Sequence, residues 1–251
     1  MNTDAGQVGI GIAIPALDGL GIVRYAFTTR QKGLGARTQG IRQPDDWKSV
    51  AEAFGISPAR LVTVNQVHGE TIVRVEESNY QGIRFAAADA LITRERGLAI
   101  GVETADCVPL LLVDPVTPAV AAVHAGWRST VKKIVQKTVA TMRDEFGSDP
   151  RRMIAAIGPA IGPECYEVDE PVMGPVRETF SFWQKVASPR GNDRWSLDLV
   201  ELNRRELMQA GLSAVNVYSF GLCTSCMADL FYSFRREGRT GRMLSVVMIR
   251  S

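Results

Sequence analysis

The chain is a succession of short apolar runs, most of them bounded by glycine, proline or polar residues. Runs of this length and composition are typical of buried β-strands. They predict strands at 22–28, 60–67, 71–75, 88–93, 98–103, 108–113, 119–124, 153–157, 215–220 and 243–249. We expect the strands at 60–67 and 71–75 to be consecutive, joined at His68 and Gly69.

A repeat of apolar positions every three or four residues marks the clearest helix, 129–146, with Gly147 as its C-terminal stop. Weaker helical patterns cover 44–54, 169–180 and 198–211, the last beginning with the capping-box spacing of Asp198 and Glu201. No internal repeat, low-complexity tract or linker divides the chain. We therefore expect one mixed α/β domain at 22–251, with mixed β-sheets flanked by helices, after a lead-in segment at 1–21.

Composition narrows the class of protein. The chain has 251 residues, 45% hydrophobic and 22% charged, which is enough to bury a substantial core. The net charge is +2 and both signs are mixed along the chain, so we expect no nucleic-acid or membrane partner. No apolar run reaches the roughly 18–20 residues that span a bilayer, and the N-terminus lacks the basic start of a signal peptide. Four cysteines are too few for a disulfide scaffold. We expect a cytoplasmic protein that is a monomer or a weak homodimer.

The two histidines of the chain and Cys107 share a position in the predicted elements. His68, Cys107 and His124 each lie at or just after the end of a predicted strand. If these strands run the same way in one sheet, the three side chains converge on one rim, where open α/β sheets bind their ligands. Two imidazoles and one thiolate are a recognised three-ligand set for catalytic zinc, with the fourth position left for water or substrate.

The same residues admit a second chemistry without a metal. Cys107 could be a nucleophile that His124 activates, with Asp106 or another carboxylate orienting the imidazole. A third interpretation is ordinary packing, because single buried cysteines and histidines are common in protein cores. Residue type and spacing leave all three open.

Two further features are weaker. Cys223 and Cys226 form a C-x-x-C pair, but a structural zinc site needs two more ligands and only Cys165 remains, so we expect a packing role for them. The arginine-rich segment 235–242 is expected to be a solvated loop, with a clamp for an anionic ligand as the alternative.

Several motifs resemble those of a known family. They are Asn-Gln-Val-His-Gly at 65–69, Ala-Asp-Ala-Leu-Ile-Thr at 88–93, Thr-Ala-Asp-Cys-Val-Pro at 104–109 and Ala-Val-His-Ala-Gly-Trp-Arg at 122–128, with further matches at 157–163 and 231–243. Together they resemble the YfiH-like proteins, long labelled multicopper polyphenol oxidases or laccase-domain proteins and since reassigned as purine nucleoside phosphorylases. The resemblance runs from about residue 22 to the end of the chain.

The resemblance implies a single α/β domain with one Zn²⁺ per chain, held by His68, Cys107 and His124. It also implies phosphorolysis of adenosine, inosine and guanosine to base and ribose 1-phosphate, cleavage of methylthioadenosine, and an adenosine deaminase side activity. The partners it implies are a small-molecule nucleoside and phosphate. Asp106 is the candidate for a proton-handling carboxylate, with orientation of a ligand as its alternative role.

Two residues of the matched region are candidates for substrate binding. Arg30 is the candidate phosphate-binding cation, and Gln66 is a candidate contact for substrate or phosphate. The loop after Arg30, residues 31–37, departs from the family pattern. If it forms part of the phosphate or sugar site, an altered substrate preference and a loss of activity are the two alternatives.

Laccase chemistry is excluded by counting. A type-1 copper plus a trinuclear copper cluster needs about ten histidines, because imidazole dominates such sites, and the chain has two. The alternatives that stay open are a metal-independent Cys-His hydrolase acting on amide or peptidoglycan-precursor substrates, a peptidoglycan-editing factor, and a binding module in which zinc is only structural.

Overall fold

The strands of the described residues form three sheets. The computed structural model describes residues 14–31 and 47–251. The largest sheet is six-stranded, in the order β12 (Val217–Ser219), β8 (Ile154–Ile157), β6 (Val108–Asp114), β7 (Ala119–Ala125), β4 (Ala90–Thr93) and β3 (Ile72–Arg74). The second is four-stranded, in the order β1 (Val23–Phe27), β13 (Met243–Ile249), β5 (Ala99–Thr104) and β2 (Leu61–Val62). The third is a small sheet of β10 (Ala187–Gly191), β11 (Arg194–Leu197) and β9 (Glu167–Val168).

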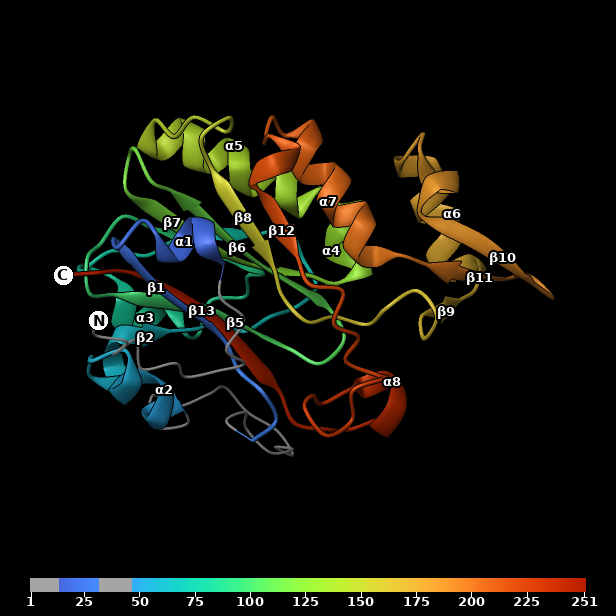
Figure 1. Ribbon diagram of the computed structural model, residues 1–251, viewed down its shortest axis with the longest axis horizontal. Coiled ribbons are helices and arrows are strands. Elements are labelled where there is room, and N and C mark those ends of the chain that lie inside the picture. The colour runs from blue at the N-terminus through green and yellow to red at the C-terminus, as the bar shows by residue number, and fades with distance from the viewer. Residues whose placement is uncertain (1–13, 32–46) are drawn as a thin grey trace.

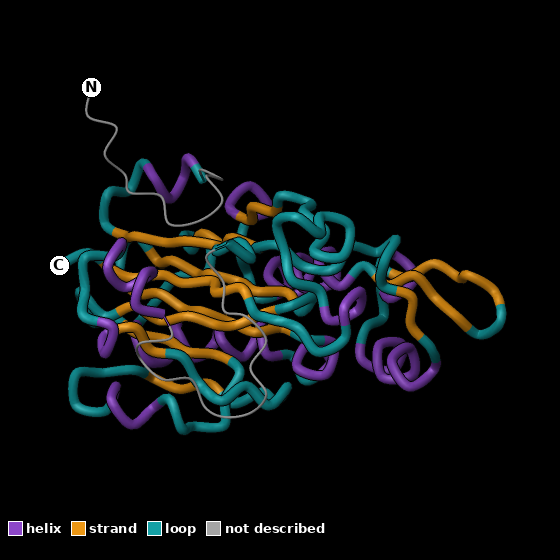
Figure 2. Tube along the Cα trace, turned by 90° about the horizontal axis from the view of Figure 1, so that it is seen from below, coloured by secondary structure: helices purple, strands orange, loops and turns teal. Residues whose placement is uncertain are grey.

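The helices lie outside the two large sheets. They are α1 (Pro15–Asp18), α2 (Lys48–Ala53), α3 (Tyr80–Ile83), α4 (Trp127–Val131), α5 (Ile134–Phe146), α6 (Glu170–Thr179), α7 (Leu199–Gln209) and α8 (Phe234–Glu237). In Figure 1, α5 and α7 cover one face of the six-stranded sheet, and the four-stranded sheet lies on its other side. Figure 2 shows the β10–β11 hairpin projecting from one end of the molecule. Within the described segments, no helix is long and apolar enough to cross a membrane.

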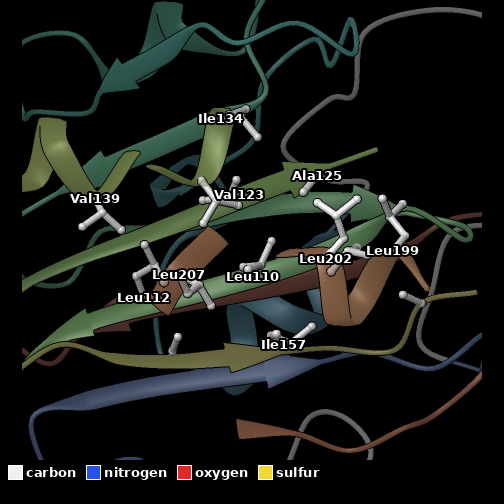
Figure 3. Close-up of a cluster of buried hydrophobic side chains, with 14 of the residues drawn as sticks. Leu110, Leu112, Val123, Ala125, Ile134, Val139, Ile157, Leu199, Leu202 and Leu207 are labelled. Carbon is white, nitrogen blue, oxygen red and sulfur yellow. The ribbon is translucent and has the colours of Figure 1, made fainter. Parts of the chain in front are cut away.

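Both faces of the central strands of the two large sheets are buried, as in β6, β7 and β13, which explains their continuous apolar runs. Along β6, Leu110 and Leu112 pack with α5 and α7, while Leu111 and Val113 belong to the cluster shared with the four-stranded sheet. This alternation follows from the two-residue repeat of a strand. Figure 3 shows the cluster that contains Leu110 and Leu112, in which side chains of β6 and β7 meet those of α5 and α7. A third cluster joins α2 to the outer face of the four-stranded sheet.

The core gives a direct stability prediction. Leu110 is fully buried in the cluster of Figure 3, so Leu110→Ala is expected to lower the free energy of unfolding by about 2–5 kcal/mol. Val116, in the turn after β6, is 58% exposed, and Val116→Ala is expected to change the free energy of unfolding by less than about 0.5 kcal/mol. Denaturant unfolding of both variants measures this. Equal losses would contradict the layer arrangement.

The predicted mixed α/β domain is confirmed, and most elements occur where the sequence pattern places them. The strand predicted at 243–249 is β13, and Gly147 ends α5 in the left-handed region, with a φ of 72°. The carboxylate of Asp198 accepts the N–H of Glu201 at 2.8 Å, which is one half of the predicted capping box. The start of the lead-in segment, 1–13, the loop at 32–37 and the beginning of the predicted helix at 44–54 lie outside the described residues.

Two predictions about connections compare differently with the structure. Strands β2 and β3 follow each other along the chain, as predicted, although β2 ends at Val62 and the two strands belong to different sheets, β2 to the four-stranded and β3 to the six-stranded one. The predicted helix 129–146 is two helices, α4 and α5. Between them Lys133 has a φ of 65°, and its ammonium group reaches the buried carboxylate of Glu206 on α7 at 3.1 Å. A left-handed residue cannot continue an α-helix, so the chain turns there.

Candidate metal centre

The side chains of His68, Cys107 and His124 meet, as predicted. The atoms that each could offer to a metal lie within 4.8 Å of one another, and His68 Nε2 is 3.8 Å from Cys107 Sγ. A tetrahedral zinc site with bonds of about 2.0–2.3 Å separates its ligand atoms by roughly 3.3–3.8 Å. The three residues therefore fit a zinc ion with small shifts of the side chains.

The route by which they meet differs from the prediction. They do not lie on one rim of parallel strands, because β6 and β7 are antiparallel and Val108, at the start of β6, pairs with Ala125, at the end of β7. Cys107 lies in the short segment that passes from β5 in one sheet to β6 in the other. His68 lies in the loop between β2 and β3. The centre thus forms where the chain crosses between the two large sheets.

Asp89 holds both histidines. Its Oδ1 accepts the Nδ1–H of His124 at 2.7 Å and the backbone N–H of His68 at 2.9 Å, and its Oδ2 accepts the N–H of Gly69 at 2.6 Å. A carboxylate on Nδ1 fixes the proton there and leaves Nε2 of His124 free to bind a metal. The contacts to the loop also stabilise His68 in the left-handed region, where its φ is 57°.

The sequence argument missed Asp89. The residue is fully buried and stands immediately before β4, where its carbonyl accepts the backbone N–H of His124 at 2.7 Å. The available signal was a lone carboxylate inside the apolar run 88–93. Because a buried carboxylate needs partners, such a residue indicates a hydrogen-bond network even before its partners are known.

The charges at the centre favour a thiolate beside a protonated imidazole when no metal is bound. Burial works to raise the pKa of the Cys107 thiol, but the charge of His124 and hydrogen bonds from both histidines lower it to about 6. Burial works to lower the pKa of His124, but the Cys107 thiolate and Asp89 raise it to about 9. Burial also opposes ionisation of Asp89, yet its hydrogen bonds with His124 and Gly69 keep its pKa below the usual value. A cation would take the place of the proton between Cys107 and His124.

Gly126 leaves room for these groups. A Cβ at this position would lie 2.9 Å from Cδ2 of His68 and 3.0 Å from Sγ of Cys107. Any larger residue would displace two of the three candidate ligands, so the close approach of the chain after β7 requires glycine.

Asp106 is used to anchor two other segments. Its Oδ1 accepts the hydroxyl of Thr224 and its Oδ2 accepts the backbone N–H of Arg235, both at 2.6 Å. These bonds hold Asp106 at a φ of 96° beside Cys107. Its carboxylate borders the cavity described below, and the proton-handling role remains a prediction.

Gln66 and Arg30 also have structural partners. The Gln66 amide exchanges hydrogen bonds with the backbone of Glu103, at 2.8 and 2.7 Å, and the residue borders the cavity. Arg30 donates to the carbonyl of Ala228 at 2.6 Å and lies 3.3 Å from Glu237. Arg30 is not one of the described residues that line the cavity, so its predicted phosphate contact remains a prediction.

A cavity of about 670 Å³ lies over the three candidate ligands. This volume falls within the range of about 300–1,000 Å³ that is typical of small-molecule sites. Its lining includes three aromatic residues and several arginines: Trp127, Tyr166, Phe234, Arg84, Arg128, Arg235, Arg239 and Arg242. The start of the arginine-rich segment 235–242 belongs to helix α8, which differs from the predicted loop, and Arg235, Arg239 and Arg242 border the cavity. The clamp for an anionic ligand remains a prediction.

A family model described as "Multi-copper polyphenol oxidoreductase laccase" matches residues 24–250. This chain belongs to the laccase-like YfiH family. Among solved structures, that of the Bacillus licheniformis hypothetical protein YfiH has a TM-score of 0.84 at 31% identity, covering 91% of this chain and 93% of that one. The structure of YlmD from Geobacillus stearothermophilus has a TM-score of 0.84 at 32% identity, covering 95% and 94%. The YfiH fold is thus shared along nearly the whole chain.

Named relatives within the YfiH family indicate the kind of enzyme. "Purine nucleoside phosphorylase YlmD" of Bacillus subtilis is 34% identical over 90% of this chain and 84% of its own length. The "Purine nucleoside phosphorylase" of Deinococcus radiodurans is 39% identical over 90% of this chain and 88% of its own length. The relatives therefore support an enzyme that acts on small-molecule nucleosides.

Proposed function

We propose that the chain is a zinc-dependent purine nucleoside phosphorylase. Its substrates are adenosine, inosine, guanosine and methylthioadenosine, and its products are the base and ribose or methylthioribose 1-phosphate. The observation that carries this proposal is the set of His68, Cys107 and His124, oriented by Asp89 and opening into the cavity. The names of the relatives support the substrate class.

The donor set suits an open zinc site. One thiolate and two imidazoles would provide three ligands to zinc, and all three residues line the cavity. When bound there, zinc would act as a Lewis acid on the substrate. Cys107 contributes the negative charge that balances the cation, and Asp89 keeps the imidazole of His124 in the metal-binding tautomer. The adenosine deaminase side activity belongs to the same proposal.

The aromatic residues of the cavity suit a purine. Trp127 and Phe234 both line the cavity, and the side chain of Phe234 is 59% exposed, so its ring is accessible to a ligand. Stacking of a base on an aromatic ring contributes about 1–3 kcal/mol. We propose that one of these rings stacks on the base.

Phosphate needs a cation within the cavity. Arg128 lines the cavity at the start of α4, four residues after His124, and its guanidinium lies over the ring of Trp127 at 4.3 Å. A guanidinium can bind two phosphate oxygens at once. We propose that Arg128 binds phosphate next to the metal, with Arg235 and Arg242 also within the cavity lining.

Arg128→Gln is expected to raise the KM for phosphate at least about tenfold, because a hydrogen bond to a charged group contributes about 1.5–3 kcal/mol. Steady-state rates at varied phosphate and saturating inosine measure this. Arg143→Gln, on the exposed side of α5, is the matched control and should leave the KM unchanged. Arg30→Gln compares the earlier candidate directly, and a larger effect there than at Arg128 would contradict this assignment.

The proposed reaction has a simple test. The purified protein is incubated with inosine or adenosine, with and without phosphate, and the base and sugar products are separated. The proposal predicts a free base and ribose 1-phosphate that form only when phosphate is present. Release of base at the same rate without phosphate, with free ribose as the product, would indicate a hydrolase instead.

A further inference from the structure

Three cysteines away from the cavity lie together where two loops meet. Cys165 belongs to the segment between β8 and β9, and Cys223 and Cys226 belong to the segment between β12 and α8. Their sulfur atoms lie within 4.8 Å of one another, and those of Cys165 and Cys226 are 3.2 Å apart. All three thiols are free. Three soft donor atoms thus converge at one place.

The backbone around Cys223 is arranged to support a thiolate. Its Sγ accepts the N–H of Gly162 at 3.2 Å and that of Cys226 at 3.4 Å. Hydrogen bonds from N–H groups stabilise the charged form of an acceptor. A Cβ at position 162 would lie only 3.2 Å from Cβ of Cys223, so the glycine allows the two loops to approach this closely.

Backbone pairing fixes the two loops relative to each other. Ala160 and Cys223 form a β-bridge, in which the N–H of Ala160 donates to the carbonyl of Leu222 at 3.2 Å and the N–H of Thr224 donates to the carbonyl of Ala160 at 3.0 Å. In Figure 1 the segment leaving β12 runs beside the segment between β8 and β9 before it reaches α8. The sulfur positions are therefore set by the folded backbone, as a preformed site requires.

We propose that Cys165, Cys223 and Cys226 form a second metal site, which binds Zn²⁺ through three thiolates. Zinc–sulfur bonds of about 2.3 Å place the sulfurs of a tetrahedral site roughly 3.8 Å apart, and the three sulfurs here all lie within 4.8 Å of one another. Thiolates select zinc over hard cations such as Mg²⁺. Among the described residues, the three cysteines provide three ligands. Because Cys226 is exposed, water can take the fourth position.

The site would brace one wall of the cavity. The Thr224 hydroxyl donates to Asp106, and Arg236 donates to the carbonyl oxygens of Thr224 and Ser225 at 2.8 and 2.7 Å. A metal on Cys223 and Cys226 would hold this loop at both ends. The site shares no ligand with the centre of His68, Cys107 and His124, so its existence does not depend on the proposed reaction.

Metal content in a chain that lacks the first centre tests the proposal. Cys107→Ala removes one ligand of the first centre, and this variant is expected to retain about one zinc per chain, against about two in the unchanged protein. Adding Cys223→Ser should remove the remaining ion. Adding Ser225→Ala in its place is the matched control and should retain it. Elemental analysis after dialysis gives the stoichiometry.

Cobalt provides a second readout of the ligands. Co²⁺ added to the Cys107→Ala chain is expected to give the sulfur-to-cobalt charge-transfer absorption of a thiolate site, and Cys223→Ser should abolish it. If Cys223→Ser fails to fold, Cys226→Ser, at an exposed position, makes the same comparison. A folded Cys107→Ala chain that binds neither zinc nor cobalt would overturn the proposal. So would alkylation of Cys165 and Cys226 only after reduction, which would indicate a disulfide.

Discussion

His68→Asn is expected to abolish phosphorolysis as completely as Cys107→Ala, with at least about a hundredfold loss of kcat/KM and loss of the metal ion held by His68, Cys107 and His124. Asparagine tolerates the left-handed backbone of position 68 but lacks the imidazole, so the change removes the ligand without straining the loop. Initial rates and elemental analysis of the two variants measure the effect. Circular dichroism and denaturant unfolding check that both remain folded.

The same pair of variants separates the metal centre from the metal-independent hydrolase. The hydrolase mechanism needs three groups, a nucleophile, a base and an orienting carboxylate. Without His68, the centre still offers these as Cys107, His124 and Asp89. In that mechanism His68 has no chemical role. A His68→Asn protein with nearly full activity, beside inactive Cys107→Ala and His124→Ala proteins, would therefore contradict the metal centre and favour the hydrolase.

Asp89→Asn is expected to lower metal affinity and activity by about 10–100-fold, the range found when a group that orients a metal-bound histidine is replaced. The carboxamide has one acceptor oxygen, whereas the carboxylate receives the Nδ1–H of His124 and the N–H groups of Val67, His68 and Gly69. The variant therefore disturbs both histidines. Zinc titration with a competing chelator gives the affinity.

Asp114→Asn is the matched control for Asp89→Asn. Asp114 is also a buried carboxylate that accepts backbone N–H groups, from Val116 and Thr117, but it lies at the far end of β6 from Cys107. Its replacement should reduce stability without changing metal affinity. Equal metal affinities for the Asp89→Asn and unchanged proteins would show that Asp89 does not position the ligands.

The strands were predictable because their environment is uniform. A strand with both faces covered needs apolar residues at every position, as in β6 and β13, and such runs stand out in a sequence. The pairing of strands does not follow from these runs. Nothing in the apolar pattern distinguishes a strand of the four-stranded sheet from one of the six-stranded sheet, so the sequence could not predict that β2 and β3 belong to different sheets.

The candidate ligands were predictable by residue type, but the network around them was not. Because the chain has only two histidines, few combinations of histidine and cysteine could form a metal site. Asp89 acts on His124 from 35 residues away, and Cys165 meets Cys226 across 61 residues. Such contacts depend on the tertiary fold, so counting ligands along the chain did not reveal that three cysteines converge.

The most direct test of the account compares three preparations of the protein in the inosine assay with phosphate: as purified, stripped of metal by a chelator, and stripped and then reloaded with zinc. The account predicts that the stripped protein forms no ribose 1-phosphate and that zinc restores the original rate. Full activity in the stripped protein would contradict a metal-dependent phosphorylase at His68, Cys107 and His124.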